Sequence, residues 1–106
     1  MNLAEFEKLR SSQPVFMLYF YNLTCGVCHT LWPQVENLIQ EKFPRIQLFR
    51  VHAEESRELA GQLQMLSVPG ILLFMNQKES FRGNGMISLQ ELESRIARPY
   101  NLLFGS

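Results

Sequence analysis

The sequence predicts an α/β protein built on a four-stranded mixed sheet with helices on both faces. Two observations carry this prediction. Segments with strand-like patterns alternate along the chain with helix-like segments, and such alternation is typical of parallel strands joined by right-handed crossovers. In addition, residues 15–21 (VFMLYFY) form a continuous apolar run, as expected for a central strand that is covered on both faces.

Two helices flank this first strand in the predicted order of elements. The opening stretch, MNLAEFEKLR, predicts a short helix with Leu3, Phe6 and Leu9 on one side. The stretch after the strand has apolar residues at i, i+4, i+7 and i+8, the spacing of a helix with one buried face; these are Leu31, Val35, Leu38 and Ile39. This helix is predicted to end at Phe43, because the residue before Pro44 avoids the helical conformation.

The second half of the chain supplies three more predicted strands. These cover residues 46–51, 70–75 and 79–82, and the last two form an antiparallel hairpin through a tight connection. The fourth strand is polar enough to lie at a sheet edge. A second long helix over residues 56–66 separates the first two of these strands, and its predicted inward residues are Leu59, Ala60, Leu63 and Leu66.

The last helix has a clear predicted start and a predicted end at a proline. Ser88 and Glu91 match the capping box that satisfies unpaired backbone N–H groups, and Pro99 is expected to stop the helix. Residues 100–106 are then unusually apolar for a terminus. Two alternatives stay open: this tail folds back onto the protein, or it forms a dimer or partner surface. A monomer is the simpler expectation.

Length, charge and hydropathy limit the functions that the chain can have. Its 106 residues predict one domain over residues 1–106. Ten basic residues balance ten acidic ones, which gives no electrostatic reason to expect a nucleic acid or an anionic membrane as partner. The start of the chain lacks the apolar core of a secretory signal, and no run approaches the roughly 20 residues of a membrane span. We therefore expect a cytoplasmic protein.

Two cysteines, Cys25 and Cys28, lie at the predicted junction of the first strand and the following helix. Residues i and i+3 on a helical turn are about 5 to 6 Å apart, which a disulfide tolerates. The partial positive charge of a helix N-terminus favours the thiolate of Cys25, and a thiolate is the species that attacks disulfides. Cys28 should be more buried and should resolve the mixed disulfide. The pair therefore predicts thiol–disulfide exchange.

Metal and haem sites are the alternatives for the same cysteines. A structural zinc ion takes four ligands, and the remaining candidates, His29 and His52, are too few and badly placed. Cys25 to His29 also spells CxxCH, the attachment pattern of c-type haem. Haem attachment would require an export signal, and the strand-rich remainder would be unusual for it. We therefore predict no metal and no bound cofactor.

The chain resembles the thioredoxin superfamily from about Pro14 to Arg98. Besides the CxxC motif, Pro33 falls where the family has a proline in its active-site helix, and Val68-Pro69 falls at the spacing of the family's cis-proline. The resemblance implies a thioredoxin fold that lacks the N-terminal edge strand. It also implies that the backbone of Val68 pairs with the substrate, and that Pro69, Thr24 and Gly85 belong to the substrate-binding groove.

The residues around the cysteines depart from the family's pattern. Thioredoxins usually read Trp-Cys-Gly-Pro-Cys, whereas Thr24, Gly26 and Val27 accompany the cysteines here. The family's proline is associated with strongly reducing behaviour, so Val27 leaves the redox direction open. Tyr19 stands where the family has a buried carboxylate, and a tyrosine titrates near 10, which makes it a poor base. Protons would then move through water, His29 or another route. A charged His29 would also lower a cysteine pKa, unless it is an exposed residue without a role.

These observations predict a dithiol–disulfide oxidoreductase that acts on protein disulfides, in the reducing direction. Recycling by an NADPH-linked reductase of the thioredoxin-reductase type is implied by the resemblance alone. Two alternatives stay open. One is a binding or adaptor module that keeps the fold but has little general reductase activity, and the other is a reductase with narrow specificity for low-molecular-weight thiols.

Overall fold

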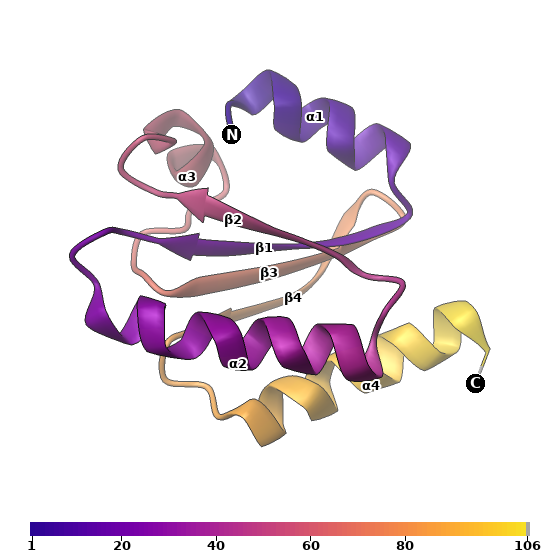
Figure 1. The fold of residues 1–106 in the computed structure, drawn as a ribbon. Helices are drawn as coiled ribbons and strands as arrows, with labels where there is room; N and C mark the ends of the chain where they lie inside the picture. The colour runs from indigo at the N-terminus through magenta and orange to yellow at the C-terminus, as the bar shows by residue number, and fades with distance from the viewer. Residues whose placement is uncertain (106) are drawn as a thin grey trace.

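The four strands form one mixed sheet in the order β2-β1-β3-β4 (Figure 1). They are β1 (Val15–Tyr21), β2 (Gln47–His52), β3 (Gly70–Met75) and β4 (Lys78–Asn84) in a computed structural model that describes residues 1–105. β1 pairs with β2 in parallel and with β3 antiparallel, and β3 and β4 form an antiparallel hairpin. Within the described residues no strand precedes β1, so β2 and β4 are the edges. The predicted four-stranded mixed sheet is confirmed.

Two helices cover each face of the sheet (Figure 1). α2 (Gly26–Lys42) and α4 (Leu89–Phe104) pack on one face, and α1 (Leu3–Ser12) and α3 (Arg57–Gln62) pack on the other. The predicted coverage of both faces is therefore confirmed. None of the helices in the described part of the chain has the length and apolar character needed to cross a membrane.

The side chains of β1 supply the centre of both cores. Met17 and Tyr19 point into the core beneath α2 and α4, whereas Phe16, Leu18 and Phe20 point into the core beneath α1 and α3. All five side chains have no solvent-exposed surface. This alternation is the two-residue period of a strand, and it explains why the whole run is apolar.

The helix α3 ends earlier than the sequence predicts. It stops at Gln62, because Gln64 adopts a left-handed conformation with φ of 55° and the amide of Met65 donates to the carbonyl of Ala60 at 2.8 Å. This bond belongs to a Schellman motif, which terminates helices and usually has glycine at the left-handed position. Met65 is buried in place of Leu66, which is 88% exposed. The predicted inward orientation of Leu66 is therefore wrong.

The prediction that Pro99 ends the last helix is also wrong. α4 continues through Pro99 to Phe104, although a proline inside a helix removes one backbone hydrogen bond. Packing beyond the proline offsets that loss. Tyr100 is 8% exposed, and its ring lies 5.1 Å from the Phe43 ring and 4.8 Å from the Phe104 ring, between centroids. The tail therefore folds onto the protein as helix, and of its apolar residues Leu102 is the one left well exposed, at 81%.

Substitution of Tyr100 tests this packing of the C-terminal turn. Tyr100→Ala should lower the free energy of unfolding by about 3 kcal/mol, because it removes a buried ring from the aromatic cluster. The matched control Leu102→Ala, in the same turn but exposed, should change it by less than about 0.5 kcal/mol. Urea denaturation measures both values. Equally small effects in the two variants, together with the loss of a dimer in solution, would show that the tail is an interface instead.

Candidate active site at the Cys25–Cys28 disulfide

Cys25 directly precedes the helix α2. It occupies the N-cap position with extended backbone, and its Sγ accepts a hydrogen bond from the backbone N–H of Cys28 at 3.2 Å. The two cysteines form a disulfide, with their Cα atoms 5.3 Å apart. In the reduced protein the same N–H and the helix dipole stabilise negative charge on the Cys25 sulfur. These are the conditions that lower a cysteine pKa and produce an attacking thiolate.

The two sulfur atoms differ in their access to solvent. Cys25 is partly exposed, whereas Cys28 is 1% exposed beneath the first turn of α2. The predicted greater burial of Cys28 is therefore confirmed. Gly26 and Val27, between them, are exposed. A partner molecule can reach Cys25 from outside, whereas Cys28 is reachable only from within the protein.

Tyr19 lies in β1 directly beneath this turn. Its hydroxyl donates to the backbone carbonyl of Cys28 at 2.7 Å, and burial raises its pKa to about 12, against a smaller opposing effect of the Arg50 charge. The sequence predicts a buried tyrosine that is a poor base, and the contact adds a structural role. The hydroxyl ties the cysteine-bearing turn to the central strand and keeps its own proton at neutral pH.

Among residues 1–105, His29 makes its hydrogen bond with the loop before the cysteines. It makes none with either sulfur atom. Its Nε2 lies 2.9 Å from the backbone carbonyl of Leu23. A carbonyl only accepts, so Nε2 carries the proton and donates. The ring also packs edge-on against Tyr21, with centroids 6.3 Å apart. His29 therefore connects the start of α2 with the end of β1, and these contacts position the loop that carries Cys25.

Asn22 is an anchor of the cysteine loop that the sequence analysis missed. Its carbonyl accepts from the N–H of Cys25 at 3.1 Å, and its side-chain oxygen accepts from the N–H of Glu54 at 3.0 Å. An asparagine directly after a strand is a known turn signal, which was available in the sequence. Thr24, in the same loop, is exposed next to Cys25.

The Val68-Pro69 peptide bond is cis and lies at the start of β3. Pro69 is buried against Gly85, where an added Cβ would lie 2.6 Å from the proline Cδ, so a larger residue there would force the proline ring or the backbone to move. Gly85 also lines an open hollow of about 440 Å³ together with Gly26 and Val27. The structure thus brings the cis-proline, Gly85 and the residues between the cysteines to one side of the molecule.

Four large apolar residues that are near the site residues in the sequence are exposed. They lie in the loop before Cys25, between the cysteines, before the cis-proline and after Gly85, and we call them the apolar rim: Leu23 (65% exposed), Val27 (59%), Leu66 (88%) and Met86 (92%). Exposed apolar groups around a reactive site are suited to protein binding. Periodicity reveals buried faces, and so it did not single out Leu23 and Met86.

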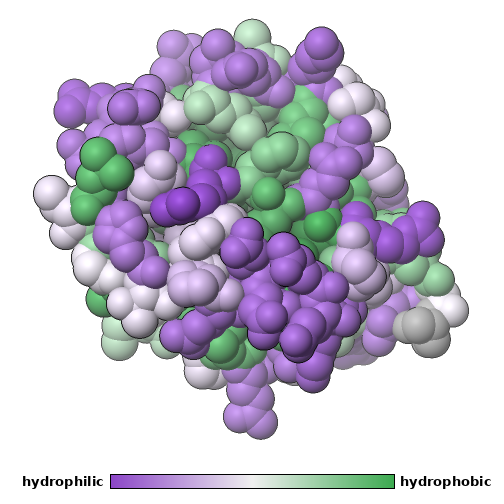
Figure 2. Space-filling model, in the orientation of Figure 1, coloured by the Kyte–Doolittle hydropathy of each residue, from purple (hydrophilic) through white to green (hydrophobic). Residues whose placement is uncertain are grey.

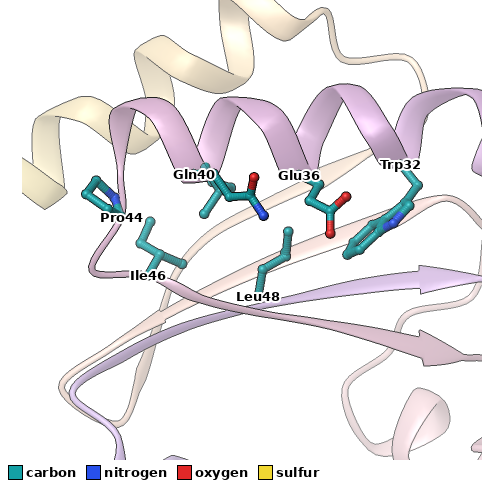
Figure 3. A pocket seen from close by; sticks show the side chains of 7 residues that line it. Trp32, Glu36, Gln40, Pro44, Ile46 and Leu48 are labelled. Carbon is teal, nitrogen blue, oxygen red and sulfur yellow. The ribbon is translucent and has the colours of Figure 1, made fainter.

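A second cavity, of about 300 Å³, lies between α2 and the edge strand β2 (Figure 3). Figure 2 shows apolar surface gathered in the middle of this face of the molecule, among polar groups. The cavity is lined by Trp32, Glu36, Ile39, Gln40, Pro44, Ile46 and Leu48. Neither cysteine and no residue of the cis-proline segment lines it. It is therefore separate from the exchange site.

Comparison with known proteins places these features in a family. A family model described as Thioredoxin matches residues 1–98. The thioredoxin-like protein YdfQ of Bacillus subtilis is 29% identical, over 98% of this chain and 92% of its own length. A thioredoxin of Mycoplasmoides gallisepticum is 27% identical, over 90% of this chain and 94% of its own length. The structure of Fasciola hepatica thioredoxin superposes with a TM-score of 0.80 at 23% identity, covering 92% of this chain and 93% of that one.

Removal of the Tyr19 hydroxyl separates a structural role from proton transfer. Because the pKa of Tyr19 is about 12, Tyr19→Phe should leave the shape of the pH–rate profile unchanged between about pH 6 and pH 9. It should cost about 1 kcal/mol of stability through the lost hydrogen bond to Cys28. The matched control Tyr21→Phe, whose hydroxyl has no partner within residues 1–105, should change stability by less than about 0.5 kcal/mol.

At alkaline pH the contribution of Tyr19 to folding stability should decrease. An unfolded tyrosine ionises near pH 10, below the folded pKa of about 12 for Tyr19. The stability that this difference provides is complete below about pH 10 and is lost as the pH rises towards the folded value. The advantage of the wild type over Tyr19→Phe should therefore shrink above about pH 10. A profile that shifts at neutral pH in Tyr19→Phe would show instead that the hydroxyl carries protons.

Proposed function

We propose that this chain, which belongs to the thioredoxin family and is a thiol–disulfide oxidoreductase, reduces protein disulfides through Cys25 and Cys28. The observation that carries the proposal is the position of Cys25. Its sulfur caps the helix α2 and accepts the N–H of Cys28 at 3.2 Å, on a partly exposed edge of the molecule. An accessible sulfur at a helix N-terminus is suited to attack as a thiolate.

The first step forms a mixed disulfide. The Cys25 thiolate attacks one sulfur of the substrate disulfide, a new bond forms between them, and the second substrate sulfur leaves as a thiolate. The N–H of Cys28 and the dipole of α2 stabilise the attacking anion before the reaction. In the mixed disulfide that charge is gone, so the helix N-terminus favours the return of Cys25 as a leaving group as well.

The second step releases the product. Cys28 attacks the Cys25 sulfur, the Cys25–Cys28 disulfide forms, and the substrate sulfur leaves with the proton that Cys28 gives up. Two electrons thus pass from the dithiol to the substrate. Tyr19 keeps its proton. Apart from tyrosines and cysteines, Ser56 is the only buried residue among residues 1–105 whose side chain is polar or charged, so no buried carboxylate or histidine is available as a proton acceptor. The proton therefore travels through water at the edge of the site.

The substrate is proposed to be an extended protein segment. It would pair with the backbone of Val68 beside the cis-proline, with its sulfur over Cys25. The apolar rim supports this assignment, because Leu23, Leu66 and Met86 offer exposed contact area that a small thiol would not cover. The oxidised pair would be recycled by an NADPH-linked reductase, and a reducing direction is consistent with the predicted cytosolic location.

Reduction of insulin disulfides tests the activity and its nucleophile. The wild type should reduce insulin well above background, and Cys25→Ser should return the rate to background. Cys28→Ser, which keeps the nucleophile, should accumulate protein substrates as mixed disulfides. The measurements are insulin turbidity and non-reducing electrophoresis. Equal background rates for the wild type and Cys25→Ser would support the adaptor alternative, and trapping of small thiols alone would support the narrow reductase.

A redox titration of the Cys25–Cys28 pair decides the direction. For a reductase we expect a reduction potential close to the thioredoxin value of about −270 mV, well below the DsbA value of about −120 mV. Intact-mass measurement after equilibration in glutathione or dithiothreitol buffers gives this potential. A potential near that of DsbA would mean that the pair oxidises its partners.

A further inference from the structure

The segment that carries the cis-proline is held at its two ends. We call residues 63–69 the docking loop; it joins α3 to β3. At its start Met65 is buried against Gly70, and at its end Pro69 is buried against Gly85. Between these anchors the loop is exposed or half-buried, up to and including Val68. The position of the Val68 backbone therefore depends on how firmly the two ends are fixed.

Arg82, on the edge strand β4, binds the start of this loop. Its Nη2 donates to the backbone carbonyl of Leu63 at 2.8 Å, and its Nη1 donates to that of Gln64 at 3.1 Å. These carbonyls follow the end of α3, where backbone oxygens lack helical partners and carry partial negative charge. The guanidinium group thus donates to two carbonyls that backbone N–H groups would bind if the helix continued.

A carboxylate on the same strand orients the guanidinium. Glu79 accepts from the Nε of Arg82 at 2.9 Å and from its Nη2 at 2.7 Å, a two-point contact. The hydrogen bond from Arg82 lowers the pKa of Glu79, so the carboxylate is charged at neutral pH. Paired contacts of this kind fix the plane of the guanidinium, which a lysine ammonium does not reproduce.

We propose that Arg82, oriented by Glu79, is a positioning residue for substrate binding. β4 pairs with β3 as far as Asn84 opposite Gly70, and Gly85 follows directly. One strand therefore fixes both ends of the docking loop, through Arg82 at its start and Gly85 at its end. The inference rests on the proposed function, in which the backbone of Val68 pairs with a protein substrate. Arg82 acts on docking and leaves the chemistry at the sulfur atoms unchanged.

The test compares Arg82→Met with the matched control Arg57→Met. Arg57 is exposed on α3, and its side chain makes no hydrogen bond or ion pair with residues 1–105. For insulin, Arg82→Met should raise KM about ten-fold with kcat within about two-fold of the wild type, because the loop that aligns the substrate is released. Reduction of hydroxyethyl disulfide, which is too small to span the loop, and the reduction potential should stay unchanged. Arg57→Met should match the wild type in every measurement.

Two further variants separate the effect of the charge from that of the guanidinium geometry. They also provide a test if Arg82→Met does not fold. Arg82→Lys keeps the charge but loses the paired geometry, so its KM for insulin should lie between that of the wild type and that of Arg82→Met. Glu79→Gln keeps the bonds to the loop carbonyls and loses the charged partner, and should give a smaller rise in KM. Full recovery in Arg82→Lys would show that charge alone suffices and would overturn the proposed geometry.

Amide hydrogen exchange tests the clamp independently of activity. Exchange at Ser67 and Val68 should be faster in Arg82→Met than in the wild type and unchanged in Arg57→Met. If wild type and Cys25→Ser both fail to reduce insulin, the proposed function fails, while the exchange rates still report on the loop. Folded Arg82→Met with wild-type KM and exchange, or with an equal loss of activity on insulin and hydroxyethyl disulfide, would overturn the role of Arg82.

Discussion

Burial of β1 on both faces is the constraint on which the rest of the structure depends. Its residues from Val15 to Phe20 are at most 2% exposed. Because successive side chains point to opposite faces, each face needs its own helical layer, and each edge of β1 needs a strand. The chain passes from β1 into the helical layer at the carboxyl end of that strand, where α2 begins. Open α/β sheets bind ligands at this end of their strands, and the cysteine pair lies there.

The same burial keeps the residue beneath the cysteines neutral in this protein, because it raises the pKa of Tyr19 to about 12. A carboxylate in the middle of β1 would be removed from water, which is costly, and Arg50, opposite Tyr19 on β2, is the cation whose charge reaches this position. Tyr19 fills the space with an aromatic ring and satisfies its hydroxyl on the carbonyl of Cys28. The site gains a firm attachment of its first helical turn and loses a proton acceptor. Proton movement through solvent, as proposed above, is compatible with this arrangement.

The features that the sequence predicted are those encoded by local patterns. β1, the helix after it and the cysteine junction follow from runs, spacings and motifs a few residues long, whereas the cis-proline position comes from the resemblance to the thioredoxin superfamily. The two wrong helix ends are accompanied by contacts between residues that are distant in the sequence. α3 ends at a left-handed Gln64, which carries no glycine signal and whose carbonyl is bound by Arg82. α4 passes Pro99 because Tyr100 packs on Phe43. No window of sequence contains both partners of either contact.

The two halves of the site are held by different parts of the sheet. β1 and α2 fix the cysteines through Tyr19, Asn22 and His29, whereas β3 and β4 fix the docking loop through Gly85 and Arg82. Residues of both halves, Gly26 and Val27 on one side and Gly85 on the other, line the surface hollow. On the proposed function, changes between the cysteines should act on the reduction potential, and changes on β4 should act on substrate docking. A family that shares the exchange chemistry can in this way vary its substrates without altering the sulfur environment.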